Sequence, residues 1–376
     1  MKNQAEQLVQ ELLFKAGITL NGQNPWDIKV HDERLYRRVL AQGSLGFGEA
    51  YMDGWWDAEK LDECLTKILH AKLEKHVSGN WKIALHAIAA RLFNMQSHRR
   101  AFKIGEAHYD IGNDLYRAML GSRMTYTCGY WSPSTGGATN LDEAQDAKLD
   151  LVCKKIGLTR GDCVLDIGCG WGGFAKFAAE RYGAHVTGIT VSKQQLELGQ
   201  ELCKGLPVEL RLQDYREVRG QFDHVISLGM FEHVGYKNYH TYMQIVRQVL
   251  KPEGLFLLHT IGGNASVTNT DPWIEKYIFP NSMLPSIAQI SRSVEGLFVV
   301  EDWHNFGTDY DKTLMAWYAN VETHWPQLKK NYSERFHRMW KFYLLASAAT
   351  FRARKSQLWQ IILSPSGVPG GYQSIR

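Results

Sequence analysis

A strand that runs into a glycine-rich turn and then into a helix is the feature that most constrains the fold of this 376-residue chain. Residues 164–173 read Val-Leu-Asp-Ile-Gly-Cys-Gly-Trp-Gly-Gly. Glycines at such a turn allow a tight change of direction and let the main chain approach a ligand closely. From about residue 162 onward, short apolar runs alternate with helical patterns. This alternation predicts βαβ units, and therefore an α/β fold with a mostly parallel, Rossmann-like sheet.

The predicted elements of this part follow the apolar periodicity. Strands are expected at residues 163–167, 184–191, 208–212, 222–228 and 254–259, and helices at residues 171–182, 193–204 and 238–250. Residues 297–302 and 357–363 can supply late strands, whereas 272–292 and 313–351 are aromatic-rich insertions of largely helical pattern. The tail that begins at Ser364 is rich in glycine, serine and proline and is expected to be loose.

The chain before this part has helical patterns only, which predicts a smaller, all-helical N-terminal domain. Helices are expected at residues 4–16, 35–40, 61–75 and 81–93, with a glycine- and aromatic-rich connection over residues 43–56. We place the boundary near residues 95–105. The prediction is a helical domain over residues 1–97 and a second domain, which contains the sheet, over residues 98–376.

Composition excludes several classes of protein. Hydrophobic residues make up 44% of the chain and charged residues 22%, which is typical of a globular protein. No apolar stretch approaches the ~20 residues of a membrane-spanning helix, and the start of the chain does not resemble a signal peptide. The six cysteines have no close paired spacing, so we predict no metal site, no disulfide framework and a cytoplasmic location.

Positive charge is concentrated in one segment. The chain has a net charge of +4, yet residues 71–105 hold seven lysines and arginines against a single glutamate. Such a segment suits anionic lipid headgroups, at ~1 kcal/mol for each basic residue near the surface. A solvated basic face or a nucleic-acid contact is the alternative interpretation.

The glycine turn leaves two kinds of cofactor to be weighed. Gly168, Gly170 and Gly173 satisfy G-x-G-x-x-G, so a dinucleotide is possible in principle. However, Asp166 would repel a pyrophosphate and favour an ammonium group, and the next strand ends without a carboxylate for an NAD ribose; Lys193 leaves NADP open. S-adenosylmethionine fits better, because it has no phosphate and because Asp214, after the third strand, can accept its adenine amine. The turn therefore predicts a class I methyltransferase sheet.

Further motifs are more specific than the turn. They are the runs 108–114 (HYDIGND), 124–131 (MTYTCGYW), 213–216 (QDYR), 229–235 (GMFEHVG), 258–262 (LHTIG) and 305–310 (NFGTDY). Together they closely resemble the bacterial cyclopropane-fatty-acyl-phospholipid synthases over nearly the whole chain. Mycolic acid cyclopropane synthases look like relatives of the catalytic part only.

The resemblance implies the reaction and its cofactors. A methylene group from S-adenosylmethionine would be added to the cis double bond of a phospholipid acyl chain, through a carbocation, with a bound bicarbonate as the base. The bicarbonate ligands implied are Cys128, Glu232, His259, Ile261 and Tyr310. Cys128 and Ile261 would contribute backbone amides, His259 and Tyr310 side-chain donors, and Glu232 would accept the bicarbonate proton. Taken alone, each has a plainer interpretation as a core, capping or packing residue.

The cofactor contacts implied by the resemblance run along the strand ends. They are Tyr126, Thr127 and Asp166 at the methionine end, Gly168, Gly170 and Gly172 in the turn, Thr190, Val191, Ser192, Gln194 and Gln195 along the ribose, and Asp214 and Tyr215 at the adenine. The resemblance also implies a homodimer that associates peripherally with the inner face of the cytoplasmic membrane, where residues 1–97 would dock on lipid and residues 98–376 would catalyse the reaction. We expect no nucleic-acid partner.

One departure from the family bears on mechanism. Ser347 stands where some family members have a cysteine, so a covalent cysteine at this place is not needed. Three rival functions remain open from the sequence: a methyltransferase that makes methyl-branched lipid, a non-enzymatic lipid-binding module and an NADP oxidoreductase.

Overall fold

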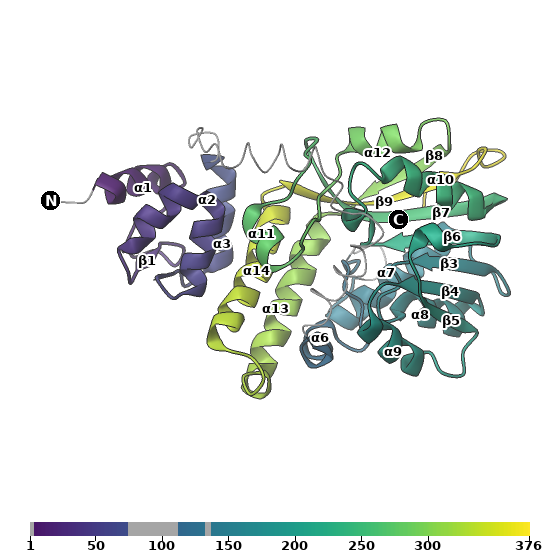
Figure 1. The fold of residues 1–376 in the computed structure, drawn as a ribbon, viewed down its shortest axis with the longest axis horizontal. Helices are drawn as coiled ribbons and strands as arrows, with labels where there is room; N and C mark the ends of the chain where they lie inside the picture. The colour runs from purple at the N-terminus through teal and green to yellow at the C-terminus, as the bar shows by residue number, and fades with distance from the viewer. Residues whose placement is uncertain (1–3, 74–111, 132–136) are drawn as a thin grey trace.

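The computed structural model describes residues 4–73, 112–131 and 137–376 (Figure 1). These residues form a seven-stranded sheet flanked by helices, and a separate group of helices from the start of the chain. Within these ranges, no helix is both long enough and apolar enough to cross a membrane.

The sheet confirms the predicted α/β class. Its strands lie in the order β5-β4-β3-β6-β7-β9-β8. Their bounds are β3 Cys163–Ile167, β4 His185–Thr190, β5 Val208–Leu212, β6 Phe222–Leu228, β7 Leu250–Gly263, β8 Val299–Asn305 and β9 Ser356–Ser364. The strands β5, β4, β3, β6 and β7 are parallel to one another, and β9 runs antiparallel between β7 and β8.

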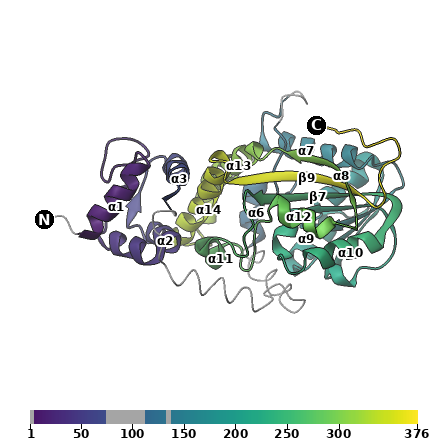
Figure 2. The ribbon, with the colours of Figure 1, turned by 90° about the horizontal axis from the view of Figure 1, so that it is seen from above.

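Alternation along the strands gives the sheet two buried faces. Val164, Ile226 and Leu257 pack with α7 (Leu141–Lys155) and α8 (Gly173–Tyr182), whereas Leu165 and Val225 pack with α10 (Tyr239–Val249) and α12 (Ile287–Val294). Successive side chains of a strand point to opposite faces, so both sides of the sheet need a cover. Figure 2 shows α7 and α8 on one side of the sheet and α10 and α12 on the other. The remaining helices beside the sheet are α6 (Asn113–Leu120) and α9 (Lys193–Leu202).

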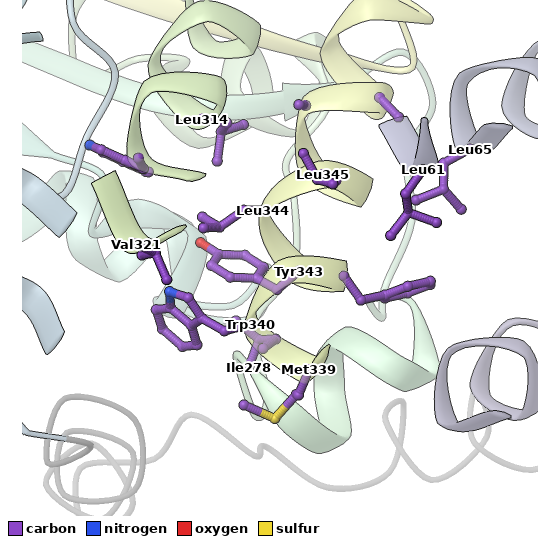
Figure 3. Packing of buried hydrophobic residues seen from close by; sticks show 14 of the residues in the cluster. Leu61, Leu65, Ile278, Leu314, Val321, Met339, Trp340, Tyr343, Leu344 and Leu345 are labelled. Carbon is purple, nitrogen blue, oxygen red and sulfur yellow. The ribbon is translucent and has the colours of Figure 1, made fainter. Parts of the chain in front are cut away.

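The N-terminal helices pack on the helical insertions of the catalytic part. α1 (Gln4–Lys15), α2 (Arg34–Met52) and α3 (Leu61–His70) stand beside α11 (Pro272–Tyr277) and α14 (Glu334–Arg352), which pairs with α13 (Thr308–Leu328) (Figure 1). A two-stranded ribbon, β1 (Lys29–Val30) and β2 (Trp56–Asp57), completes the N-terminal part. Figure 3 shows Leu344 and Leu345 of α14 between Leu314 of α13 and the leucines of α3. One apolar core therefore joins the two parts.

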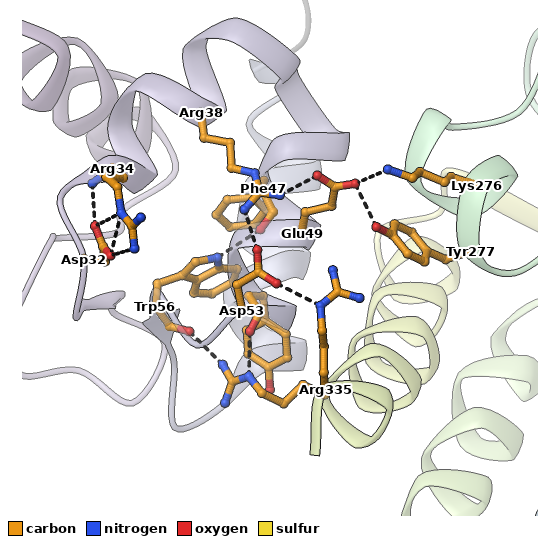
Figure 4. Close-up of polar contacts among 12 residues, drawn as sticks. Asp32, Arg34, Arg38, Phe47, Glu49, Asp53, Trp56, Lys276, Tyr277 and Arg335 are labelled. Atoms are coloured by element: carbon orange, nitrogen blue, oxygen red, sulfur yellow. Dashed lines mark hydrogen bonds and ion pairs between the residues drawn. The ribbon is translucent and has the colours of Figure 1, made fainter. Parts of the chain in front are cut away.

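An ionic network also connects the N-terminal part to α11 and α14 (Figure 4). The carboxylate of Glu49 on α2 accepts hydrogen bonds from Arg38 Nη2 at 2.5 Å, Lys276 Nζ at 2.5 Å and the Tyr277 hydroxyl at 2.8 Å. Asp53 accepts from Arg38 Nη1 at 2.7 Å and Arg335 Nε at 2.9 Å. Two acidic residues of the N-terminal part thus bind cations of both parts.

Some sequence predictions about the fold were wrong. The connection expected from residue 43 onward is helical as far as Met52, because α2 continues through it with a kink at Gly43 (φ 58°, ψ −131°). The tail was expected to be loose, yet the Tyr372 hydroxyl donates to the Lys155 carbonyl and Arg376 pairs with Asp302. The helix predicted at residues 81–93, the basic segment beyond residue 73 and the domain boundary near residue 97 lie outside the described residues.

Candidate active site

A cavity lies at the carboxyl ends of β3, β4, β5 and β6, where an open α/β sheet binds its ligands. Its walls come from the turns after these four strands and from the segment before α7. The lining residues are Met124, Thr125, Tyr126, Thr127, Asp166, Ile167, Gly168, Cys169, Gly170, Trp171, Gly173, Phe174, Ile189, Thr190, Val191, Gln195, Gln213, Asp214, Tyr215, Arg216, Leu228, Gly229, Met230, His233 and Val234.

The glycine turn is required at the floor of this cavity. Gly168 has φ +84°, and a Cβ placed on it would lie 2.6 Å from the Cβ of Met230. Gly170 has φ +55° and open space where its Cβ would be. Both conformations are strained for residues that carry a Cβ, so the turn needs glycine for two reasons, backbone conformation and close packing.

One end of the cavity combines a buried acid with a buried base. Asp166 is 1% exposed, and its Oδ1 atom has no hydrogen-bond partner among the described residues. Burial raises the pKa of Asp166 to about 7, partly offset by Lys148. Lys148 of α7 is fully buried and donates to Thr127 Oγ1 at 2.8 Å. Burial lowers the pKa of Lys148 to about 7. An amino-acid group, which has an ammonium and a carboxylate, fits such an end.

The opposite end is built around Asp214. Its Oδ1 accepts the backbone N–H of Arg216 at 2.9 Å, and its Oδ2 accepts Arg216 Nη1 at 2.9 Å. Each carboxylate oxygen has a further lone pair, so Asp214 can still accept an adenine amine. Between the ends, Thr190 donates to Gln195 Oε1 at 2.7 Å. The donor set and the unpartnered Asp166 oxygen therefore fit S-adenosylmethionine.

Ten of the thirteen predicted cofactor residues line the cavity: Tyr126, Thr127, Asp166, Gly168, Gly170, Thr190, Val191, Gln195, Asp214 and Tyr215. Gly172, Ser192 and Gln194 do not. Gly172 precedes α8, where a Cβ would meet Cys203 and Leu210. Ser192 caps α9 by accepting the Gln195 N–H, and Gln194 lies in the first turn of that helix.

The five predicted bicarbonate ligands lie outside the lining of this cavity. They come from a strand, a helix and two connecting segments. His259 and Ile261 lie within β7, which continues to Gly263, and Tyr310 lies in the first turn of α13. Glu232 belongs to η4 (Phe231–His233), directly after β6, and Cys128 to the segment before α7.

Glu232 binds the amide that was expected to hold the anion. Its Oε1 accepts the Ile261 backbone N–H at 2.7 Å, and its Oε2 has no partner among the described residues. Burial raises the pKa of Glu232 to about 7, although the Ile261 amide acts in the opposite direction. A carboxyl group with such a pKa can accept a proton near neutral pH.

His259 presents an unused donor. The ring is 1% exposed, and burial lowers its pKa well below the usual range, so the imidazole is neutral. Gln360 Nε2 lies 3.3 Å from His259 Nδ1. With the amide donating in this assigned orientation, the ring proton is on Nε2. His259 Nε2 has no partner among the described residues, which suits an anion.

The other two members of the set are Tyr310 and Cys128. Tyr310 lies against the rings of Trp317 (centroids 5.9 Å apart) and Phe351 (4.7 Å). The Cys128 thiol is fully buried, 3.7 Å from the Thr313 hydroxyl, and burial raises its pKa. A neutral thiol enclosed in this way packs as a small apolar group.

Fifteen lining residues were not predicted from the sequence. His233 carried the clearest signal, because it follows Glu232 in a quoted motif. It is half-buried, its buried Nδ1 atom is unpartnered among the described residues, and desolvation lowers its pKa to about 4. Arg216 also follows the predicted Asp214 closely. Lys148, which binds Thr127, carried no sequence signal, because the helix that contains it was not predicted.

Comparisons with known proteins agree on one family. The family model described as mycolic acid cyclopropane synthetase matches residues 96–361. The chain is 52% identical over 369 residues to the cyclopropane-fatty-acyl-phospholipid synthase of Escherichia coli strain K12, covering 98% of this chain and 95% of that protein. It is 32% identical over 390 residues to the tuberculostearic acid methyltransferase UfaA1 of Mycobacterium tuberculosis, covering 98% and 91%.

A solved structure agrees with the fold of the catalytic part. The mycolic acid cyclopropane synthase CmaA1, complexed with SAH and CTAB, superposes with a TM-score of 0.64 at 30% identity. The match covers 70% of this chain and 97% of CmaA1. The comparison leaves part of this chain without a counterpart in CmaA1.

Proposed function

The chain is a methyltransferase of the mycolic acid cyclopropane synthetase family, and from that premise we propose that it converts unsaturated acyl chains of membrane phospholipids into cyclopropane acyl chains. The observation that carries the proposal is the turn after β6. Met230 and His233 line the cofactor cavity, and Glu232 between them binds the neighbouring β7. A methyl donor therefore fits on the cavity side of this turn, and Glu232 can act as a proton acceptor on the side that faces β7.

Bound S-adenosylmethionine supplies a methyl group on a sulfonium. Asp166 and Thr127 would hold it at one end and Asp214 at the other, with the glycine turn beneath it. This placement would hold the donor at a fixed distance from an acyl chain, and such positioning accounts for much of the rate of a two-substrate reaction.

The alkene would attack the methyl carbon, the methyl–sulfur bond would break to release S-adenosylhomocysteine, and the acyl chain would carry a carbocation. The residues of the protein must therefore exclude water and face the cation with electron-rich groups. Tyr310, Trp317 and Phe351 pack together as an aromatic cluster, and we assign both roles to this cluster. Aromatic faces attract cations, by about 2 kcal/mol where water is absent.

Closing the ring requires removal of a proton from the added carbon. We assign the base to bicarbonate, held by His259 Nε2, the Tyr310 hydroxyl and the amides of Cys128 and Ile261. Glu232 would accept its proton, which the raised pKa of this carboxyl supports. The Ile261 N–H, which donates to Glu232 in the structure, would then be shared between the two groups.

The test is incubation of the protein with vesicles of unsaturated phospholipid and methyl-labelled S-adenosylmethionine, followed by mass spectrometry. Ring formation adds about 14 Da to the acyl chain and removes the alkene, by atom counting. Methyl branching with a reductant would add about 16 Da and identify the rival reaction. Label that never enters lipid would overturn the proposal.

The same proposal includes docking on the bilayer through the basic segment, residues 71–105, and assembly as a homodimer. Reversal of Arg99, Arg100 and Lys103 to glutamate should abolish co-sedimentation with anionic vesicles and spare cofactor binding. Unchanged sedimentation would refute the docking surface. Sedimentation velocity at several protein concentrations would test the dimer separately.

A further inference from the structure

Helix α7 carries two fully buried lysines on one face, Lys148 and Lys155, which are two helical turns apart. The ammonium of Lys155 has His304 Nδ1 at 2.9 Å. The ammonium of Lys148 has Thr127 Oγ1 at 2.8 Å. Among the described residues, no carboxylate forms an ion pair with Lys148.

A buried ammonium without a counterion is costly, because the loss of hydration is not repaid. Neighbouring groups give Lys148 little compensation. Asp166 favours its charged form, but burial outweighs this effect and lowers the pKa of Lys148. A lysine kept in this position beside a cavity is therefore explained best by an anion that arrives with the ligand.

Thr127 connects Lys148 to the cavity. Thr127 lines the cavity, and its hydroxyl oxygen accepts the ammonium N–H. A hydroxyl that accepts one hydrogen bond retains its own proton as a donor, so it can pass the interaction on to an acceptor in the cavity. Gln145, one turn before Lys148, holds the same segment by donating to the Thr127 carbonyl at 2.8 Å.

Asp166 lines the same end of the cavity with a buried oxygen that lacks a partner among the described residues. An unpartnered buried acceptor and a hydroxyl backed by an ammonium are complementary to the two charges of an amino-acid zwitterion. Neither group alone would distinguish a zwitterion from a simple amine or a simple acid.

We infer that Lys148, acting through Thr127, recognises the carboxylate of the methionine moiety of S-adenosylmethionine, while Asp166 receives its ammonium. The inference deepens the proposed function and rests on it, because it concerns the same cofactor cavity. Lys148 is a positioning residue: it fixes the amino-acid end of the donor, and thereby the methyl carbon, without touching it.

The test is calorimetric titration of the full chain with two ligands that differ by one group, S-adenosylhomocysteine and its decarboxylated analogue, which keeps the amine. Lys148→Met retains the length of the side chain and removes the charge. We expect it to weaken S-adenosylhomocysteine binding at least 10-fold and to change binding of the analogue less than 2-fold. A purely structural role would weaken both ligands equally.

Lys155→Met is the matched control, since it removes an equally buried lysine from the same face of α7, paired with His304 instead of Thr127. It should leave the ratio of the two affinities unchanged. If Lys148→Met fails to fold, Thr127→Val carries the test, and the same selective loss of S-adenosylhomocysteine binding is expected.

Equal losses for both ligands, or unchanged S-adenosylhomocysteine binding, in whichever of these two variants folds would overturn the inference. The wild-type titration separates this failure from a failure of the proposed function. A wild-type chain that does not bind S-adenosylhomocysteine contradicts the function itself, whereas normal wild-type binding with an insensitive variant contradicts only the role of Lys148.

Discussion

Glu232 Oε1 lies 2.7 Å from the backbone nitrogen of Ile261 and accepts its N–H, although 29 residues separate the two in the chain. The bond joins the turn after β6 to β7 and leaves Glu232 Oε2 buried without a partner among the described residues. A carboxyl group held by one oxygen and open at the other is well placed to receive a proton from a ligand.

Glu232→Gln should abolish most turnover and preserve cofactor binding. Glutamine keeps the oxygen that accepts the Ile261 N–H, but it cannot take up a proton. Loss of a proton acceptor costs on the order of 10²-fold in rate, measured as transfer of labelled methyl to phospholipid. Affinity for S-adenosylhomocysteine should stay within 2-fold of wild type.

The exposed Glu209, which pairs with Arg211 on β5, provides the control for this variant. Glu209→Gln should transfer methyl at the wild-type rate. Near-normal turnover of Glu232→Gln would remove the proton-accepting role.

Glu232 should also make folding stability depend on pH. Its folded pKa, about 7, lies above the ordinary glutamate pKa of 4.5. Between these values the folded state keeps the proton and the unfolded state releases it, so stability falls as the pH rises from 4.5 to 7. The loss is at most on the order of 3 kcal/mol.

Glu232→Gln should remove this contribution. Urea titrations at pH 4.5 and pH 8 should therefore show the variant gaining stability relative to wild type at the higher pH, while the other titrating groups cancel in the comparison. A constant difference between the two proteins would mean that Glu232 titrates normally.

Glu49 should have the opposite dependence. Burial raises its pKa, but hydrogen bonds from Lys276, Tyr277 and Arg38 outweigh it and lower the pKa to about 2. The resulting stability is present above pH 4.5 and is lost as the pH falls through the folded pKa. Lys276 is half exposed, so solvent screening reduces the contribution to about 2 kcal/mol.

Glu49→Gln should lower the free energy of unfolding by about this amount at pH 7 and have much less effect near pH 3, as measured by denaturant titration. The exposed Glu59→Gln serves as the control and should change stability little at either pH. An equal effect of Glu49→Gln at both pH values would contradict the ionic origin.

Gly168 and Gly170 should respond differently to the same substitution. Both have positive φ, but only the Cβ of Gly168→Ala would overlap Met230. Forcing an extra carbon into a packed site costs about 1–3 kcal/mol, so Gly168→Ala should lower the melting temperature of the ligand-free protein more than Gly170→Ala does. Equal shifts would show that backbone strain alone matters at this turn.

Local patterns were sufficient to predict the sheet and the turn on which the cofactor cavity is built. The strand at Cys163–Ile167 and the glycines after it lie within one short stretch of sequence. The strands and helices that follow are visible in the spacing of apolar residues a few positions apart. The predicted Asp166 and Asp214 line the cavity for the same reason, since the carboxyl ends of parallel strands share one edge of a sheet.

Predictions failed where packing between distant segments overrides local preference. Glycine disfavours helix, yet Gly48 lies in α2 because a Cβ there would come within 2.5 Å of Trp273 on α11. The tail is likewise fixed by a contact with a distant segment, because Arg376 pairs with Asp302 of β8. Neither contact leaves a trace in the local sequence.

The sequence alone determined the sheet, the glycine turn and the family, because each depends on short patterns and their order. Only the tertiary structure decided which polar groups are buried and what they face. Lys148 meets Thr127, and His259 meets Gln360, only after folding has excluded water from both pairs. Burial sets the charge state of such groups, and burial depends on packing across the whole molecule.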